Sequence, residues 1–215
     1  MLSSAELGFD HRYIPGTGVA ARTTLLLLHG TGGDADSLLQ LGHALYPDAT
    51  LLSPAGPVFE HGARRFFRRF AEGVFDLDDL LRRTDDLYQF VNAAVTHYGL
   101  DPARIVAAGY SNGANIAASL VLRHPGVLAG AVLFRAMVPY IPEPLPAIPA
   151  TPVLLCAGRA DPLVPPALLE QLATLLESSG AVVARNTTPD GHELSIGDVT
   201  AARRWLAATF PAERE

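Results

Sequence analysis

The chain has 215 residues, 49% of them hydrophobic, and a net charge of −6, which suits one globular domain over residues 1–215. All 16 basic residues are arginine, which excludes chemistries that need a lysine amine, such as Walker-type phosphate loops and Schiff-base enzymes. The single cysteine, Cys156, excludes an intrachain disulfide and cysteine-rich zinc sites. A mildly acidic chain without a clustered basic face also argues against a nucleic-acid partner.

The N-terminal stretch has neither the cationic start nor the apolar core of a secretory signal. No apolar run reaches the roughly 18 residues that a membrane span needs. We therefore expect a cytoplasmic protein with no membrane partner. Cys156 lies in an apolar, strand-like run, which favours a buried core thiol over a reactive one.

Strand-like apolar runs alternate with amphipathic stretches along the chain. In order, the pattern predicts a strand over 23–30, a helix over 34–46, a strand over 49–56, a helix over 77–99, a strand over 104–111, a helix over 112–125, strands over 128–139 and 151–158, a helix over 166–180, a strand over 181–188 and a helix over 198–210. Unbroken apolar strands separated by helices indicate a mostly parallel α/β sheet covered on both faces. The proline-rich segment 138–152 is expected to be a stiff loop.

The segment GYSNG, residues 109–113, follows a predicted buried strand and opens a predicted helix. Glycine weakens strands and helices, so this placement indicates that the backbone needs space around Ser111. The segment fits the G-x-S-x-G nucleophile elbow, in which a sharp strand-to-helix turn projects a serine hydroxyl into the crevice at the carboxyl ends of the strands. The simpler interpretation is a small-residue turn without chemistry.

A serine hydroxyl needs a base to remove its proton, and the base needs a carboxylate to orient it. Only His124 and His192 follow Ser111 in the sequence, and His192 lies between the last strand and the last helix, where the base of such a fold belongs. Asp161 comes just after a strand and is the favoured acid. Asp190, Glu193 and Asp198 are the alternatives: Asp190 is close in sequence to His192, and Asp198 is expected in the final helix.

The oxyanion of an acyl-transfer reaction would be held by the backbone amides of Asn112, after the nucleophile, and Thr31, in the glycine loop after the first predicted strand. That loop, GTGGDA at 30–35, also scores as a dinucleotide fingerprint. The next strand ends without the acidic residue that holds a ribose, so an oxyanion loop is the better interpretation and no cofactor or metal is expected.

Four arginines, Arg64, Arg65, Arg68 and Arg69, interleave with Phe66, Phe67 and Phe70. The plainer interpretation is a solvated segment whose aromatic rings pack inward. The functional interpretation is a flap over the crevice, with Arg65, Arg68 and Phe67 contacting the substrate and an arginine binding a carboxylate through its two-pronged guanidinium.

The segments LLLLHGTGGD, GYSNGANIAASL, GRADPLVP and GHEL together resemble the small carboxylesterase/phospholipase-like α/β-hydrolases, from about residue 23 to about residue 210. The segment RRFFRRFAEGVFDLDDL further resembles the branch associated with the breakdown of hydroquinones and other aromatic compounds. The resemblance implies an α/β-hydrolase fold of about seven strands with a minimal lid. It also implies a cytoplasmic serine esterase without a cofactor, and a homodimer by family habit. The family commonly carries Gln where this chain has Asn112.

Two other functions stay open at this point. A thioesterase or lysophospholipase would use the same serine, acid and histidine, but a long acyl chain needs an apolar groove. A non-catalytic small-molecule binder could occupy the same fold, although it has no reason to keep the three side chains in this order.

Overall fold

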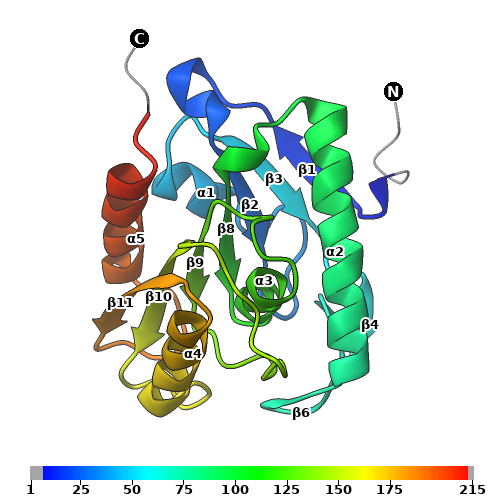
Figure 1. The fold of residues 1–215 in the computed structure, drawn as a ribbon, viewed down its shortest axis with the longest axis vertical. Helices are drawn as coiled ribbons and strands as arrows, with labels where there is room; N and C mark the ends of the chain where they lie inside the picture. The colour runs from blue at the N-terminus through cyan, green and yellow to red at the C-terminus, as the bar shows by residue number, and fades with distance from the viewer. Residues whose placement is uncertain (1–6, 213–215) are drawn as a thin grey trace.

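A seven-stranded sheet forms the middle layer of the protein, in a computed structural model that describes residues 7–212 (Figure 1). The strand order is β1-β3-β2-β8-β9-β10-β11, with β1 antiparallel to β3 and every other neighbouring pair parallel. The strands are β1 (His11–Ile14), β2 (Thr24–Leu28), β3 (Thr50–Pro54), β8 (Ile105–Tyr110), β9 (Gly130–Phe134), β10 (Pro152–Gly158) and β11 (Val182–Thr188). The predicted α/β-hydrolase fold is confirmed.

Helices cover the sheet on both faces, and each face has its own apolar core. Helices α2 (Leu77–Tyr98), α3 (Asn112–Arg123) and α4 (Pro166–Ser178) pack on one face, and α1 (Leu39–Leu45) and α5 (Ile196–Thr209) on the other. Short 3-10 turns, η2 (Gly18–Arg22) and η3 (Pro102–Arg104), lead into β2 and β8. No helix within residues 7–212 has the length and apolar character needed to cross a membrane.

Three of the differences from the predicted element boundaries have a local cause in the structure. The helix predicted over 34–46 is shorter and comprises only α1, which begins at Leu39. The Asp34 side chain accepts a hydrogen bond from Ser37 Oγ (2.8 Å) and stabilises a turn before the helix. The last helix begins two residues early, because Ser195 and Asp198 form a capping box. The strand predicted over 128–139 ends at Phe134, because Arg135 adopts a left-handed conformation with φ of 58°.

The sequence analysis missed β1 and four short strands. β1 lies at the sheet edge, and its partly exposed residues carry no apolar run. The arginine-rich segment contributes to two hairpins, which pair β4 (Val58–Glu60) with β5 (Ala63–Arg65) and β6 (Arg69–Ala71) with β7 (Val74–Phe75). Phe66 and Phe67 between them are fully buried, whereas Phe70 is exposed. The expectation of inward-packed rings is therefore correct for two of the three aromatics.

The parallel strands place their carboxyl ends at one edge of the sheet, where the predicted site residues follow β2, β8, β10 and β11. The first six residues, which belong to the N-terminal stretch examined for a signal, lie outside the described part of the chain. Cys156 is fully buried within β10, as predicted for a core thiol.

Candidate active site

Ser111 occupies a strained turn between β8 and α3, with φ of 53° and ψ of −114°. Its amide donates a hydrogen bond to the Phe134 carbonyl (2.9 Å), which ties the turn to β9. A Cβ at Gly113 would collide with the carbonyls of Leu28 and His29, and a Cβ at Gly109 would lie 2.6 Å from the Gly113 oxygen. The predicted reason for these glycines, close approach of strand and helix, is confirmed.

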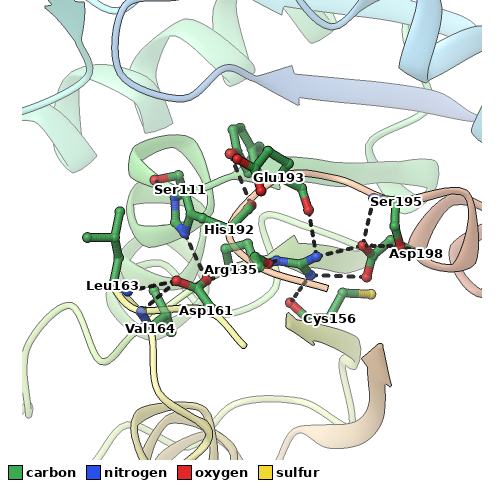
Figure 2. A network of polar contacts seen from close by, with 12 residues as sticks. Ser111, Arg135, Cys156, Asp161, Leu163, Val164, His192, Glu193, Ser195 and Asp198 are labelled. Carbon is green, nitrogen blue, oxygen red and sulfur yellow. Dashed lines mark hydrogen bonds and ion pairs between the residues drawn. The ribbon is translucent and has the colours of Figure 1, made fainter. Parts of the chain in front are cut away.

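The side chains of Ser111, His192 and Asp161 form a continuous chain of hydrogen bonds (Figure 2). His192 Nε2 lies 3.0 Å from Ser111 Oγ, and His192 Nδ1 lies 2.8 Å from Asp161 Oδ2. An ionised carboxylate can only accept, so Nδ1 carries the ring proton and Nε2 has a free lone pair toward the hydroxyl. The tertiary structure thus brings together the three side chains that the sequence singled out.

Asp161 is fixed by its own loop before it contacts the histidine. Its Oδ1 atom accepts hydrogen bonds from the backbone amides of Leu163 (2.8 Å) and Val164 (3.0 Å), which leaves Oδ2 for His192. The side chain is fully buried. The two amide hydrogen bonds fix the carboxyl group so that Oδ2 points at the imidazole, which is the arrangement that orients a base.

The alternative base His124 and the alternative acid Asp198 lie away from the serine, and Asp190 and Glu193 lie in the loop of His192, whose Nδ1 is bonded to Asp161. His124 stacks on Tyr88 with ring centroids 3.9 Å apart and contacts Asp85 (2.8 Å) at the far end of α3. Asp198 lies in the first turn of α5, as predicted, and its Oδ2 atom accepts hydrogen bonds from Ser195.

Arg135 is a site residue that the sequence analysis missed. Its side chain is fully buried between the loop of His192 and the start of α5, with Nε 4.0 Å from Asp161 Oδ2. Nothing in the predicted strand over 128–139 marked this arginine, although a charged residue next to a buried apolar run could have raised the question of its partner.

The two amides predicted to stabilise an oxyanion lie in loops that are themselves held in place. His29 Nε2 accepts a hydrogen bond from the Gly56 amide (2.9 Å), and the Gly32 amide donates to the Arg64 carbonyl (2.8 Å), so the glycine loop is fastened on both sides. Neither the Thr31 nor the Asn112 amide donates a hydrogen bond to another residue in the described range 7–212. Asn112 also begins α3, whose N-terminus favours negative charge.

Ser111 and His192 face a narrow crevice with a volume of about 20 Å³. Its lining combines polar and apolar side chains: Thr31, Arg65, Arg69, Glu72, Phe75, Asn112, Asn115, Arg135, Met137, Leu163 and Val164. Two of the predicted substrate contacts lie outside this lining. The half-exposed Arg68 pairs with Asp76 (2.9 Å), and Phe67 packs into the core against Phe75.

Arg65 is the predicted contact that lies in the crevice. Its Nη1 donates to Thr31 Oγ1 (2.6 Å) and its Nε to the Phe67 carbonyl (3.1 Å). Burial, and then the charge of nearby Arg69, lowers the pKa of the Arg65 guanidinium. Each of the two guanidiniums beside the serine also has a carboxylate partner: Arg65 Nε lies 3.6 Å from Glu60 Oε2, and Arg69 forms an ion pair with Glu72.

The described part of the chain, 7–212, contains no group of three or more His, Cys, Asp or Glu side chains arranged to hold a metal ion. The polar residues of the crevice are instead arranged around a hydroxyl, an imidazole and two amides.

A family model for phospholipases and carboxylesterases matches residues 10–210. The chain belongs to the phospholipase/carboxylesterase family.

Relatives of this family member support the same assignment. It is 44% identical to MhqD of Bacillus subtilis, named as a hydrolase, over 91% of the chain and 96% of the relative. The crystal structure of a Bacillus cereus carboxylesterase superimposes with a TM-score of 0.92 at 41% identity, covering 96% of this chain and 97% of that one. A structure of YahD with malic acid gives a TM-score of 0.86 at 31% identity, covering 94% and 99%. The phospholipase/carboxylesterase family member described here is an esterase-type hydrolase.

Proposed function

We propose that the protein is a serine hydrolase of carboxylic esters, with Ser111 as nucleophile, His192 as base and Asp161 as the carboxylate that orients the base. The observation that carries this proposal is the unbroken hydrogen-bond chain from Asp161 through His192 (2.8 Å) to Ser111 (3.0 Å). These separations are within the range for proton transfer between a nucleophile and its base.

The reaction begins when His192 Nε2 takes the hydroxyl proton as Ser111 Oγ attacks the ester carbonyl. The oxyanion accepts hydrogen bonds from the amides of Thr31 and Asn112, each contributing on the order of 3 kcal/mol to transition-state stabilisation. His192 then donates the proton to the leaving alcohol, and an acyl-serine forms. Water, activated by the same imidazole, hydrolyses the acyl-serine and regenerates the enzyme. Throughout, Asp161 holds the Nδ1–H tautomer and stabilises the protonated ring.

A fluorophosphonate probe tests this function directly, because it labels only an activated serine. We expect labelling at Ser111 and turnover of short nitrophenyl esters, with both lost in Ser111→Ala, which deletes one hydroxyl and leaves the fold intact. A Ser111→Ala variant with normal turnover would reject the nucleophile. A wild-type protein that binds esters but neither turns over nor reacts with the probe would instead support a non-catalytic binding protein.

The proposed substrate class rests on Arg65 and Arg69, which both line the crevice. We propose that an anionic group of the substrate binds near these guanidiniums, since arginine binds carboxylates with two parallel hydrogen bonds. YahD, a structural relative, was solved with the dicarboxylic acid malic acid. Arg65→Gln should raise KM for acidic esters much more than for neutral ones, while Arg68→Gln, outside the crevice, is the matched control. Equal effects of Arg65→Gln on both ester types would contradict carboxylate binding.

A thioesterase or lysophospholipase activity is the second candidate. An apolar groove of about 540 Å³ lies between the proline-rich loop and α4, lined in part by Val138, Ile141 and Leu175. A panel of nitrophenyl esters of increasing acyl length separates the two functions. Activity that falls beyond short acyl chains supports the carboxylesterase, and activity that rises with chain length supports the lipid-directed alternative.

The resemblance to small carboxylesterases also underlies two proposals on the protein's working form. We propose that it acts in the cytoplasm and as a homodimer. Light scattering on the purified protein should give the mass of two chains, and the mass of one chain at micromolar concentration would contradict the dimer. Cell fractionation tests the location.

A further inference from the structure

Every N–H group of the Arg135 side chain donates a hydrogen bond, although the side chain is fully buried. Nη1 and Nη2 bind the two carboxylate oxygens of Asp198 at 3.0 and 2.7 Å. Nη1 also donates to the Cys156 carbonyl at 3.3 Å. The guanidinium thus joins the ends of β9 and β10 to the start of α5.

The two remaining hydrogen bonds go to the residues on either side of His192. Nε donates to the Gly191 carbonyl (2.9 Å), and Nη2 donates to the Glu193 carbonyl (2.8 Å) (Figure 2). The backbone before and after the imidazole is therefore held by one rigid, planar group. A lysine ammonium has three donors on a flexible stem and cannot reproduce this pattern.

We call Arg135 and its five hydrogen bonds the Arg135 clamp. The backbone conformation at Arg135 and at the end of β10 makes the clamp possible. Arg135 adopts its left-handed conformation with its amide bonded to the Cys156 carbonyl (2.8 Å), which turns the side chain beneath the loop of His192. A Cβ at Gly158 would collide with the carbonyls of Asp190 and Gly191, so the end of β10 admits the loop only because that position is glycine.

The charge of the guanidinium is compensated locally. Burial by itself lowers the pKa of Arg135, but the hydrogen bonds and charge of Asp198 outweigh this and leave it raised, so the group stays charged. The ion pair with Asp198 is fully buried. Breaking a buried pair on one side is strongly destabilising, so a purely structural role is the alternative that an experiment must separate.

We propose that Arg135 is a positioning residue, whose five hydrogen bonds hold the backbone around His192 so that the imidazole faces Ser111 and Asp161 together. This inference rests on the proposed function of His192 as the base. It predicts that loss of the guanidinium lowers kcat far more than it changes KM, because all five N–H groups are already bound to protein acceptors and none is left for the substrate.

Two variants test the proposal, and one control accompanies them. Arg135→Lys keeps the positive charge but loses the planar guanidinium and its five donors. The double variant Arg135→Met with Asp198→Asn removes both charges of the buried pair, so neither partner is left as an unpaired ion, and it keeps an amide that can cap α5 beside Ser195. Leu172→Ala, in the core under α4, is a destabilising control on the opposite face of the sheet from α5. All are assayed at 25 °C, well below their measured unfolding temperatures.

We expect kcat to fall about 100-fold in either Arg135 variant with KM nearly unchanged, a size typical of an ångström-scale misplacement. In the wild type, NMR on 15N-histidine-labelled protein should show the His192 Nδ1 proton as a protected, low-field signal, and both variants should lose it. Leu172→Ala should keep the signal and the wild-type kcat despite a lower unfolding temperature.

Three outcomes decide the matter. A folded Arg135 variant with wild-type kcat and an unchanged Nδ1 signal overturns the positioning role. A loss of kcat in Leu172→Ala equal to that in the Arg135 variants overturns it as well, since stability alone would then explain the effect. If the wild-type protein itself neither turns over esters nor reacts with fluorophosphonate, it is the proposed function that fails.

Discussion

The two loops that meet at the candidate site are held in place by different physical means. The turn around Ser111 is set by close packing, in which glycines at 109 and 113 let α3 approach β2 and β8. The loop around His192 is set by hydrogen bonds from a buried guanidinium whose partners come from three other segments. The first device is encoded within five consecutive residues, whereas the second exists only after the chain has folded.

This difference predicts whether a substitution in each loop reduces stability or activity first. A packed turn has no room to yield, so a small added group should cost stability. A hydrogen-bonded loop can shift by a fraction of an ångström while the fold survives, so the same kind of change should cost activity first. The following experiments test the comparison, from the largest expected effect to the smallest.

Asp161→Asn should lower kcat by about 10⁴-fold with little change in fold, because an amide facing Nδ1 favours the wrong imidazole tautomer. Steady-state kinetics on a short nitrophenyl ester measures the effect. Asp190→Asn is the matched control, since Asp190 lies two residues before His192, whose ring nitrogens are bonded to Asp161 and Ser111. A loss in Asp161→Asn no larger than that in the control would mean that His192 does not depend on this carboxylate.

Gly113→Ala should destabilise the protein by about 3 kcal/mol, because the added methyl group meets backbone carbonyls of Leu28 and His29 that cannot rotate away. Urea unfolding followed by circular dichroism measures the change. Gly197→Ala in α5 is the control, since its Cβ would meet only side-chain atoms, the nearest being a Thr188 methyl at 3.2 Å. Equal midpoints for the two variants would show that the elbow is not tightly packed.

Gly158→Ala should instead reduce kcat by about 100-fold while the protein stays folded, because its methyl group would push the Gly191 carbonyl out of the Arg135 clamp. Fluorophosphonate labelling of Ser111 should slow in parallel. The comparison of the two loops breaks down if Gly158→Ala unfolds the protein as strongly as Gly113→Ala and leaves the kcat of the folded fraction intact.

The smallest expected effect is a change of stability with pH that comes from Cys156, whose thiol is fully buried. Burial, and then the charge of Asp198, raises the pKa of its thiol in the native state. The native thiol keeps its proton where the unfolded thiol ionises, near pH 8.5. Its contribution to stability is therefore complete below that pH and falls above it by up to ~1.4 kcal/mol per pH unit.

Urea midpoints between pH 7 and 10 measure this slope, and Cys156→Ala should flatten it. Native Cys156 should also resist iodoacetamide at pH 8 while Ser111 reacts with the fluorophosphonate. Rapid alkylation of the native thiol would show that the buried end of β10, next to the Arg135 clamp, opens to solvent.

Much of the fold was predictable from the sequence because its signals are local. The helix over 77–99 was placed within a residue of α2 because its amphipathic pattern spans several turns, and the structure shows that Asp76 caps its start. β1 was not predictable, since four residues with one buried side chain carry no periodic signal and become a strand only by pairing with β3. The end of β9 was misplaced because the apolar pattern continues past Arg135.

The candidate site divides in the same way. Ser111, Asp161 and His192 were identified because each follows a predicted strand, and parallel strands end at the same edge of a sheet. Which arginines of 64–69 face the crevice was not predictable, because Arg65 and Arg68 have the same composition around them and differ only in how the hairpins fold. Arg65 is buried beside Thr31, and Arg68 reaches outward to Asp76.

The sequence by itself determined the alternation of strands and helices, the strained serine turn and the order of the three polar residues. Each of these depends on backbone sterics and apolar spacing over a few neighbouring residues. Only the tertiary structure decided the role of Arg135, whose side chain meets Cys156, Gly191, Glu193 and Asp198 at separations of 21, 56, 58 and 63 residues. A buried charge depends on whichever groups surround it, and those groups are assembled only when the sheet has formed.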